Sequence, residues 1–364
     1  MNGEDHAQAL TGLYLTSLGN ARRILHTISP KEHMHPAESV VSRKSFNDEF
    51  LESFWRFICE RQQIWHRRFV EQQFPPWTND NILKTTRFTN VYRELDPGTQ
   101  YALREILETR LSIQDKIFNV MLYRLIGRTE TFSAIGLQYV SSFDSSFLEK
   151  KLRFIRDVEG KPPFSGAYIV STYLRMGSRD KVVNIARLFD ILAKSFDRVS
   201  DCLLACRSAK DAFLELRRVY GFGTFLAYQV LVDLLYPLKI NGGKPILPFT
   251  HNDWAIAGPG ARRGAEILLS SHMRTKDLQV MRWLYEHQQT EFERLRLSFP
   301  YLRDQHGDPV PVSLSNIENC LCEFYKYIKI RSGTGRARRR FVARELNEPV
   351  NWLPTQSNVD RIRK

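Results

Sequence analysis

Apolar residues recur at every third or fourth position through much of this 364-residue chain. The clearest example is the set Phe46, Phe50, Phe54 and Phe57, which this spacing places on one face of an amphipathic helix. No pair of alternating β-branched segments joined by a hairpin turn stands out. The best strand candidate, residues 168–174, could equally be helical. We therefore predict an all-α fold.

Helix-breaking and helix-capping residues divide this pattern into several helices. PPWT at 75–78 ends the first helix, and Asp96 followed by Pro97 should open a later one. No internal repeat or low-complexity linker interrupts the chain, which favours one helical unit of one or two lobes. The predicted parts are an N-terminal arm or cap (1–44), a helical domain (45–341) and a polar C-terminal tail (342–364).

The chain is strongly basic, because 53 Lys and Arg against 40 Asp and Glu give a formal net charge of +13. This excess predicts a polyanionic partner, although a solvated basic surface is the alternative. The densest basic segment runs from Lys326 to Arg344 and contains no acidic residue. We predict that its Arg338, Arg339 and Arg340 bind phosphates. The segment also fits a nuclear import signal, so we expect a nuclear protein if the source is eukaryotic and a cytoplasmic one otherwise.

Several classes of chemistry lack their motifs in this sequence. The five cysteines form no CxxC pair, and no HExxH, HxE with PCxxC or acidic metal box occurs, so we predict no metal site and no disulfide framework. No GxxxxGK[ST] loop occurs, and NGGK at 241–244 lacks its first glycine and its hydroxyl residue. We therefore expect no cofactor and no nucleoside triphosphate as a partner. No run of eighteen apolar residues occurs, so we expect no membrane contact, while the oligomeric state is left open.

Two glycine-bearing turns, each of which should open a helix, flank the pair Asp253 and Trp254. The first turn, YGFGT, contains Gly221 and Gly223, which let the backbone approach a phosphate closely. A helix N-terminus adds unpaired N–H groups and a positive dipole end, which favour an anion. We predict phosphate binding here, and a simple glycine turn between two packed helices is the structural alternative.

The second turn, AGPGARRG, contains Gly258 and Gly260 and places Arg262 and Arg263 in the first turn of the following helix. Basic side chains are unfavourable at that end of the helix dipole unless an anion binds there. We therefore predict that these glycines and arginines also bind DNA phosphates.

Five ordered blocks between residues 50 and 341 carry a family resemblance. They are FWRFICERQQIWHRR, PWTNDNILKTTRFTNVYREL, YGFGTFLAYQVLVDL, HNDWAIAGPGARRG and SLSNIENCLCEFYKYIKIRSGTGRARRRF. Together they resemble the helical domain shared by 5-hydroxymethyluracil DNA kinases and alpha-glutamyl/putrescinyl-thymine pyrophosphorylases. The resemblance implies a fold related to the helix-hairpin-helix DNA glycosylases and a protein that engages a modified thymine in DNA.

A base that reacts must leave the stack, and aromatic contacts offset part of that cost. Residues in the matching blocks are candidates for a pocket that holds the base or its leaving group. These residues are Arg61, Trp77, Arg87, Tyr92, Arg93 and Trp254. The three aromatic side chains could equally belong to the core.

Three carboxylates are candidate catalysts, namely Asp253, Glu318 and Glu323. In the glycosylases an aspartate after the hairpin stabilises the positive charge that develops when the glycosidic bond breaks. Asp253 follows Gly223 by thirty residues, which is farther than usual. Glu318 and Glu323 are five residues apart on one helix, so they should not both face one site.

We therefore predict a DNA-binding enzyme that acts on a flipped, modified pyrimidine, either 5-hydroxymethyluracil or a hypermodified thymine. The reaction is displacement at the 5-methylene group or base excision. A non-catalytic reader of modified DNA is the alternative. An RNA partner is a weaker alternative, since charge alone does not distinguish the two polymers.

Overall fold

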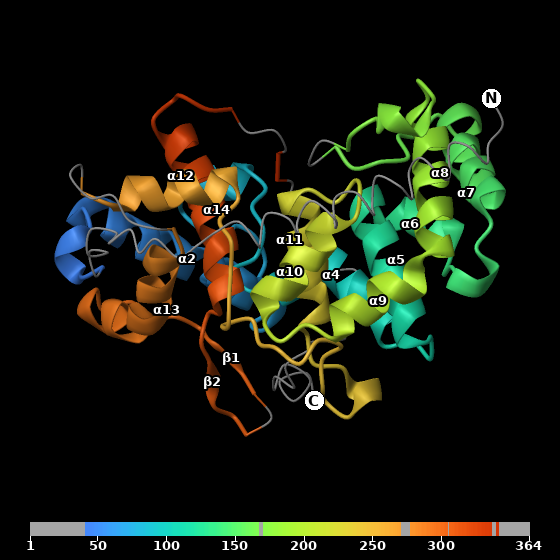
Figure 1. Ribbon diagram of the computed structural model, residues 1–364. Helices are drawn as coiled ribbons and strands as arrows, with labels where there is room; N and C mark the ends of the chain where they lie inside the picture. Colours follow the sequence, from blue (N-terminus) through green and yellow to red (C-terminus); the bar gives the residue numbers. More distant parts are fainter. Residues whose placement is uncertain (1–40, 167–169, 271–276, 305, 337–339, 342–364) are drawn as a thin grey trace, which may run out of the picture. The chain divides into compact units, whose positions relative to one another are not determined.

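The structure is a computed structural model that describes residues 41–166, 170–270, 277–304, 306–336 and 340–341. Nearly all regular structure in these residues is helical, which confirms the predicted all-α fold (Figure 1). Their α-helices are α2 (Asp48–Phe69), α3 (Asn81–Thr85), α4 (Pro97–Ala102), α5 (Ile113–Ile126), α6 (Thr129–Ile135), α7 (Ser145–Arg153), α8 (Lys181–Lys194), α9 (Phe196–Leu204), α10 (Ala209–Arg218), α11 (Thr224–Leu234), α12 (Pro259–Leu268), α13 (Asp277–Arg294) and α14 (Leu314–Arg331). Two short strands, β1 (Leu302–Arg303) and β2 (Pro309–Val310), pair antiparallel.

Some predicted segments lie partly or wholly outside the described residues. The N-terminal arm or cap is described only from Val41 onward, and the tail 342–364 lies outside. Residues 170–173 of the strand candidate are not strand, and Leu174 begins the 3₁₀-helix η6 (Leu174–Met176). Across the ranges given above, no helix combines the length and the apolar character needed to cross a membrane.

Helix α2 carries three of the four phenylalanines of the predicted stripe, whereas Phe46 lies before the helix, with its ring 4.3 Å from that of Trp283. The Asn47 side chain caps the helix by accepting a hydrogen bond from the Phe50 N–H, at 3.2 Å. Phe54 and Phe57 are buried, and their ring centroids lie 5.4 and 5.8 Å from that of Phe324 in α14. The spacing seen in the sequence therefore marks the face that packs against α14.

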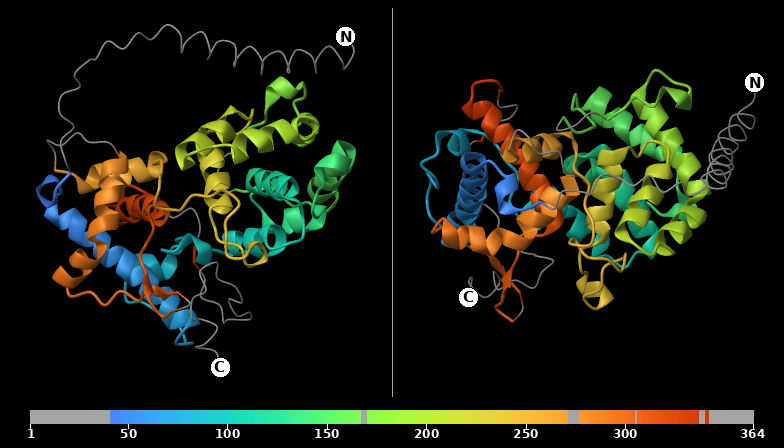
Figure 2. Two further views of the ribbon diagram at one scale, coloured as in Figure 1. Left: turned by 60° about the horizontal axis from the view of Figure 1, so that its bottom comes forward. Right: turned by 60° about the vertical axis from the view of Figure 1, so that its left-hand side comes forward.

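Helix α14 packs against α2, α12 and α13, and the red ribbon of α14 stays beside the blue α2 and the orange α12 in both further views (Figure 2). The contact with α12 depends on glycine. A Cβ added at Gly264 would lie 2.8 Å from the carbonyl carbon of Leu321, and one at Gly260 would overlap the Sγ of Cys322. These glycines therefore let the two helices approach at backbone distance.

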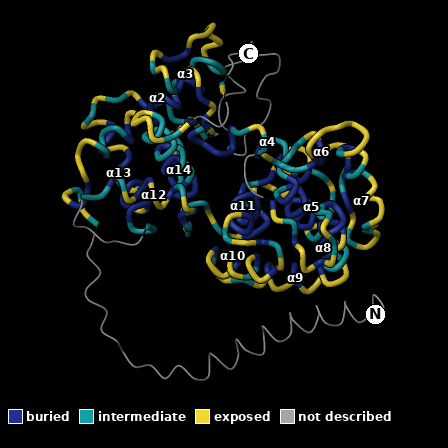
Figure 3. Tube along the Cα trace, turned by 90° about the horizontal axis from the view of Figure 1, so that it is seen from above, coloured by how far each residue is buried: buried dark blue, intermediate teal, exposed yellow. Residues whose placement is uncertain are grey.

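Helices α5 and α11 pack against each other and are buried along most of their length (Figure 3). A buried ion pair joins them, because the Arg124 guanidinium donates to both carboxylate oxygens of Asp233 at 2.5 Å. Helix α10 packs against α11 through the five-residue turn that links them. These contacts fix the position of α11, which carries Tyr228 and Gln229.

Candidate functional site

Arg93 lies where the 3₁₀-helix η2 (Arg93–Leu95), α11 and α14 meet. Its backbone N–H donates to the Asn316 Oδ1 of α14 at 3.0 Å, and its guanidinium donates to the Gln229 side chain of α11. The side chain is buried, yet its Nε has no hydrogen-bond partner among the described residues. A buried cation with an unused donor is costly, which makes it a candidate ligand-binding group.

Three further buried polar atoms beside Arg93 lack a hydrogen-bond partner in the described part of the chain. They are the hydroxyls of Tyr228 and Tyr236 and the Nε2 of His251. The Tyr236 and His251 rings lie 4.3 Å apart between centroids. Each such atom costs about 1–3 kcal/mol when nothing satisfies it. Each of the four atoms therefore requires an explanation, and a ligand that supplies the missing hydrogen bonds is one.

Two carboxyl groups complete this group of side chains. We name it the Arg93 cluster, and its members are Arg93, Glu94, Tyr228, Tyr236, His251 and Glu318. Burial is the largest influence on the pKa of the last five groups, and the positive charge of Arg93 lowers the pKa of every one of them. The charge of Arg93 therefore acts on all five groups.

The carboxyl groups of Glu94 and Glu318 both have raised pKa values, which suit them to proton transfer. Burial raises the pKa of Glu94 to about 7, although a hydrogen bond from the Asn316 amide, 3.3 Å long, opposes the shift. Burial also raises the pKa of Glu318, against the charge of Arg93 and the Gly258 N–H, which donates to Glu318 Oε1 at 3.0 Å. Carboxyl groups with a pKa nearer to neutrality are effective general acids and bases.

The His251 imidazole is a neutral ring in the cluster. Burial, together with the Arg93 charge, lowers the pKa of its imidazole to about 3. Its Nδ1 lies 3.0 Å from the Ser315 hydroxyl, so the direction of that hydrogen bond decides whether Nε2 donates or accepts. The ring is therefore a neutral hydrogen-bonding group at neutral pH.

The loop before α12 reaches the cluster because it is tied to the start of α14. The Asn252 side chain accepts from the Leu314 N–H at 3.0 Å, and the His251 carbonyl accepts from the Ser315 N–H at 3.3 Å. Ser313 caps α14 by accepting from the Asn316 N–H. Capping and loop attachment thus fix His251 and Glu318 at one end of α14.

The two predicted residues of this loop, Asp253 and Trp254, have different surroundings. Asp253 is exposed, and both of its carboxylate oxygens accept hydrogen bonds from Thr250 at 2.8 Å. Trp254 is half-buried, with its ring 4.9 Å from Phe213 and 6.2 Å from Tyr228. Trp254 therefore borders the Arg93 cluster, whereas Asp253 is occupied within its own turn and its catalytic role stays a prediction.

Glu323 and two of the predicted arginines lie at the loop that precedes η2. Glu323 accepts from the Thr89 N–H at 3.1 Å, and Arg61 donates to the Thr89 carbonyl at 2.9 Å. The Arg87 side chain is exposed, while its backbone carbonyl accepts from Lys326. Glu318 and Glu323 thus contact different segments, as their spacing predicted.

Two of the predicted stacking residues are core residues in the structure. Tyr92 has no exposed surface, and its hydroxyl donates to the Val310 carbonyl at 2.6 Å. Trp77 is buried and donates its indole N–H to the Gln73 carbonyl at 2.7 Å. Neither ring offers a free face to a base, so the stacking prediction for these two residues gains no support.

The predicted phosphate-binding turns have intramolecular contacts of their own. Gly221 adopts a left-handed φ of +91°, and Gly223 is exposed at the start of α11. In the second turn the anion at the α12 N-terminus is the Glu318 carboxylate, bound to the Gly258 N–H, while Gly260 packs on α14. Phosphate binding at both turns stays a prediction.

The arginines predicted to bind phosphate differ in how the structure places them. Arg262 and Arg263 are exposed and pair with Asp277 and Glu266, each at 3.0 Å. Arg340 is exposed, and its backbone forms an isolated antiparallel β-bridge with that of Thr86. Arg338 and Arg339 lie outside the described residues. Acidic neighbours therefore account for the arginines of the second turn without a bound anion.

Sequence reasoning identified Arg93 and Glu318 but missed most of the cluster. The missed members are Glu94, Tyr228, Tyr236 and His251, and the two hydrogen-bond partners of Arg93, Gln229 and Asn316, were missed as well. All but Tyr236 lie within the five sequence blocks quoted above, and Tyr228, Gln229 and Tyr236 interrupt apolar runs. That interruption was the available signal, but it does not show which polar atoms lack partners.

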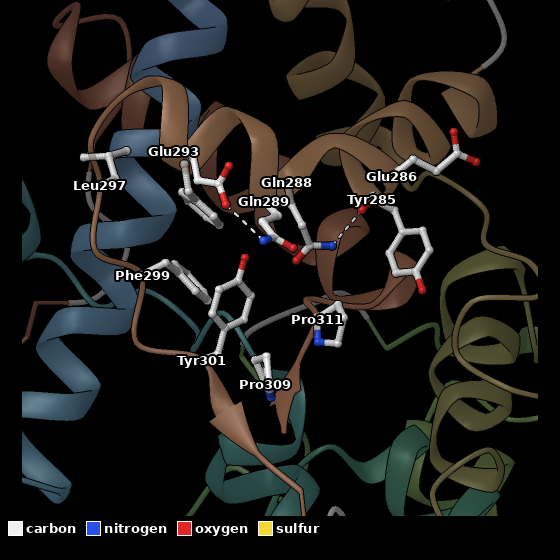
Figure 4. Close-up of a pocket in the computed structure, with 11 residues that line it drawn as sticks. Tyr285, Glu286, Gln288, Gln289, Glu293, Leu297, Phe299, Tyr301, Pro309 and Pro311 are labelled. Carbon is white, nitrogen blue, oxygen red and sulfur yellow. Dashed lines mark hydrogen bonds between the residues drawn. The ribbon is translucent and has the colours of Figure 1, made fainter. Parts of the chain in front are cut away.

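A separate hollow of about 410 Å³ lies beneath α13, lined by aromatic, proline and acidic side chains (Figure 4). The Phe292 and Phe299 rings stack with their centroids 4.5 Å apart. Gln289 donates to Glu293 at 2.9 Å, above Phe299 in the view of Figure 4. None of its lining residues belongs to the Arg93 cluster. No group of three or more His, Cys, Asp or Glu among the described residues is placed to hold a metal ion.

The fold and the site define an all-α protein with a buried polar cluster centred on one arginine. The chain belongs to the family described as "5-hmdU DNA kinase, helical domain", which it matches over residues 48–336. A 5-hmdU DNA kinase of Bacillus phage SP10 is 29% identical over 332 residues, which cover 87% of this chain and 50% of that relative. The chain thus spans half the length of this relative. A comparison with solved structures gave no match.

Proposed function

We propose that this chain binds DNA containing a 5-hydroxymethyluracil-type pyrimidine and receives the flipped base in the Arg93 cluster. This proposal depends on the four buried polar atoms that have no hydrogen-bond partner among the described residues. A pyrimidine presents carbonyl oxygens and an N–H, and its 5-hydroxymethyl group adds a hydroxyl, so it supplies the acceptors and donors that these atoms require. The name of the phage relative, a 5-hmdU DNA kinase, supports the choice of base.

We propose that the base enters at the margin of the cluster. Gln229, His251 and Trp254 are only half-buried, unlike Arg93 and the two tyrosines. The Trp254 ring gives a flat face on which a base can stack, which is worth about 1–3 kcal/mol. Stacking of this size offsets much of the few kcal/mol that base flipping costs.

Glu318 is the carboxylate that the cluster favours as the proton acceptor. In displacement, an amine forms a C–N bond to the 5-methylene carbon while the C–O bond to its leaving group breaks; in base excision, water forms a C–O bond to C1′ while the C1′–N1 bond to the base breaks. Either reaction requires a base that takes one proton from the nucleophile. Glu318 has a raised pKa and is under the influence of the Arg93 charge, which would stabilise the negative charge on the departing oxygen in displacement or on the departing uracil ring in excision. We therefore assign the transferase or glycosylase-like step to Glu318 and Arg93, with Asp253 as the competing candidate.

A reader of modified DNA is the second candidate, because unpartnered polar atoms require only a bound base and no reaction. Mass spectrometry separates the two. The purified chain is incubated with a duplex containing one 5-hydroxymethyluracil, with an added amine and with or without Mg-ATP, and the nucleosides are then analysed. A mass-shifted nucleoside or a released base supports the enzyme, whereas unchanged DNA with a retained gel shift supports the reader.

Variants assign the catalyst in the same assay. Glu318→Gln should abolish the product while DNA binding persists, and Asp253→Asn should leave the product intact. The ATP arm tests the prediction that no nucleoside triphosphate is needed. Binding that does not distinguish 5-hydroxymethyluracil from thymine would contradict the proposal in either form.

A further inference from the structure

Two turns outside the Arg93 cluster are joined into one surface. The Tyr173 hydroxyl, just before η6, donates to the Gly221 carbonyl in the α10–α11 turn at 3.1 Å. The Tyr173 ring also lies edge-on to Tyr220, with centroids 6.1 Å apart. A Cβ at Gly221 would lie 2.9 Å from the Leu188 Cδ2, so the turn sits directly on α8. These contacts fix the two turns relative to each other.

Large apolar side chains are exposed on these turns and on the first turn of α11. The exposed fractions are 66% for Leu174, 38% for Tyr220 and 46% for Phe225. We name these three side chains the turn surface. Exposed apolar side chains grouped in this way mark a contact surface rather than ordinary solvent exposure.

Arginines with no acidic partner accompany the turn surface. Arg175, Arg179 and Arg217 are exposed, and in the part of the chain that the structure describes none of them forms an ion pair. Arg218, the neighbour of Arg217, is instead neutralised by Glu215. Uncompensated guanidinium groups beside aromatic side chains match a partner that carries both phosphates and stacking bases.

Helix α11 connects this surface to the Arg93 cluster. Phe225 lies in the first turn of α11, and Tyr228 of the cluster follows three residues later on the same helix. This separation corresponds to a rise of about 4.5 Å along the helix axis. A strand bound at the turn surface would therefore pass close to the site proposed for the flipped base.

We propose that the turn surface binds an unpaired DNA strand. Tyr220 and Phe225 stack on its bases, Leu174 packs against a base or sugar, and Arg175, Arg179 and Arg217 bind its phosphates. The inference rests on the proposed function for the identity of the partner, and it adds a sequence-independent contact that the Arg93 cluster does not provide.

Fluorescence anisotropy with a labelled single-stranded oligonucleotide tests the stacking. The double variant Tyr220→Ala, Phe225→Ala should bind about a hundredfold more weakly, because each of the two base stacks is worth about a factor of ten. The matched control is Phe147→Ala with Phe154→Ala, which removes two exposed rings of similar accessibility, 38% and 50%, from another surface. Unchanged affinity of the first pair, or an equal reduction in the control, would overturn the proposal.

Salt dependence tests the arginines separately. Replacing Arg175, Arg179 and Arg217 with Gln should reduce the slope of log affinity against log salt by about 0.7 for each single-strand phosphate that the variant no longer binds. An unchanged slope would remove these arginines from the interface. Sedimentation without DNA gives a further check, since a lower mass of the Tyr220→Ala, Phe225→Ala variant would show that the turn surface joins copies of the chain instead.

The two proposals fail in different ways. The ratio of affinities for 5-hydroxymethyluracil and thymine reports on the Arg93 cluster alone. A variant of the turn surface with weaker binding and an unchanged ratio supports this inference. A wild-type ratio of one contradicts the proposed function while the weaker binding of the turn-surface variants still stands.

Discussion

Alanine substitutions at the glycines of AGPGARRG test whether these glycines serve helix packing or phosphate binding. In Gly264→Ala the new Cβ would lie 2.8 Å from the Leu321 carbonyl carbon and 3.2 Å from its Cα, so two helix backbones must separate. Overpacking costs about 1–3 kcal/mol, and a backbone yields less than a side chain, so we expect a decrease of about 3 kcal/mol in the free energy of unfolding. Gly260→Ala meets only the Cys322 side chain at closest approach.

Gly260→Ala should therefore be rescued in part by Cys322→Ala, with a coupling of about 0.5–3 kcal/mol, whereas no side-chain truncation should rescue Gly264→Ala. Urea unfolding measures all of these changes. Gly223→Ala is the matched control, because nothing lies within 4 Å of its added Cβ, and it should lose about 1 kcal/mol or less. Unchanged stability of Gly264→Ala, together with weaker DNA binding, would refute the packing explanation and restore the phosphate site.

Three further predictions concern charge. Arg124→Met leaves Asp233 buried without its partner and should cost about 3–5 kcal/mol in urea unfolding, whereas Arg263→Met, which breaks an exposed pair, should cost about 1 kcal/mol or less. Because burial raises the pKa of Glu94 to about 7, its contribution to stability is complete below pH 4.5 and is lost as the pH rises through 7. In Glu94→Gln, the urea midpoint of unfolding should therefore change less between pH 4.5 and pH 8 than in the parent protein. Replacing Arg338, Arg339 and Arg340 with Ala should lower the salt dependence of duplex binding by about 0.9 for each phosphate that is no longer bound, and an unchanged slope would favour nuclear import.

The fold class could be predicted because helical periodicity is local. The stripe of Phe54 and Phe57 and the helix start at Asp96 and Pro97 depend on residues close in sequence, and the structure has both the helix face and the helix start. The roles of Gly260 and Gly264 could not be predicted in this way, since they depend on α14, more than fifty residues later. A glycine that binds a phosphate and one that contacts another helix look the same in sequence.

The candidate site could be predicted only in part for a similar reason. Arg93 and Glu318 stood out as charged residues within the family blocks. Tyr228 and Tyr236 read as core aromatics, and they are buried as core residues are. Their importance comes from hydroxyls that have no partner among the described residues, which only the three-dimensional arrangement reveals. For the same reason the sequence indicated Asp253 as a candidate site residue but not His251, two residues earlier.

The central claim is that the unpartnered atoms of the Arg93 cluster await a modified base. The most direct measurement determines stability and base recognition for the double variant Tyr228→Phe, Tyr236→Phe. This variant deletes two buried hydroxyls that lack a partner in the described part of the chain. Tyr92→Phe is the matched control, because it deletes a buried hydroxyl bonded to the Val310 carbonyl. For the first variant we predict unchanged or higher stability and a loss of the preference for 5-hydroxymethyluracil over thymine, and for the control a stability decrease of about 1 kcal/mol with that preference intact. A preserved preference in the double variant would contradict the account.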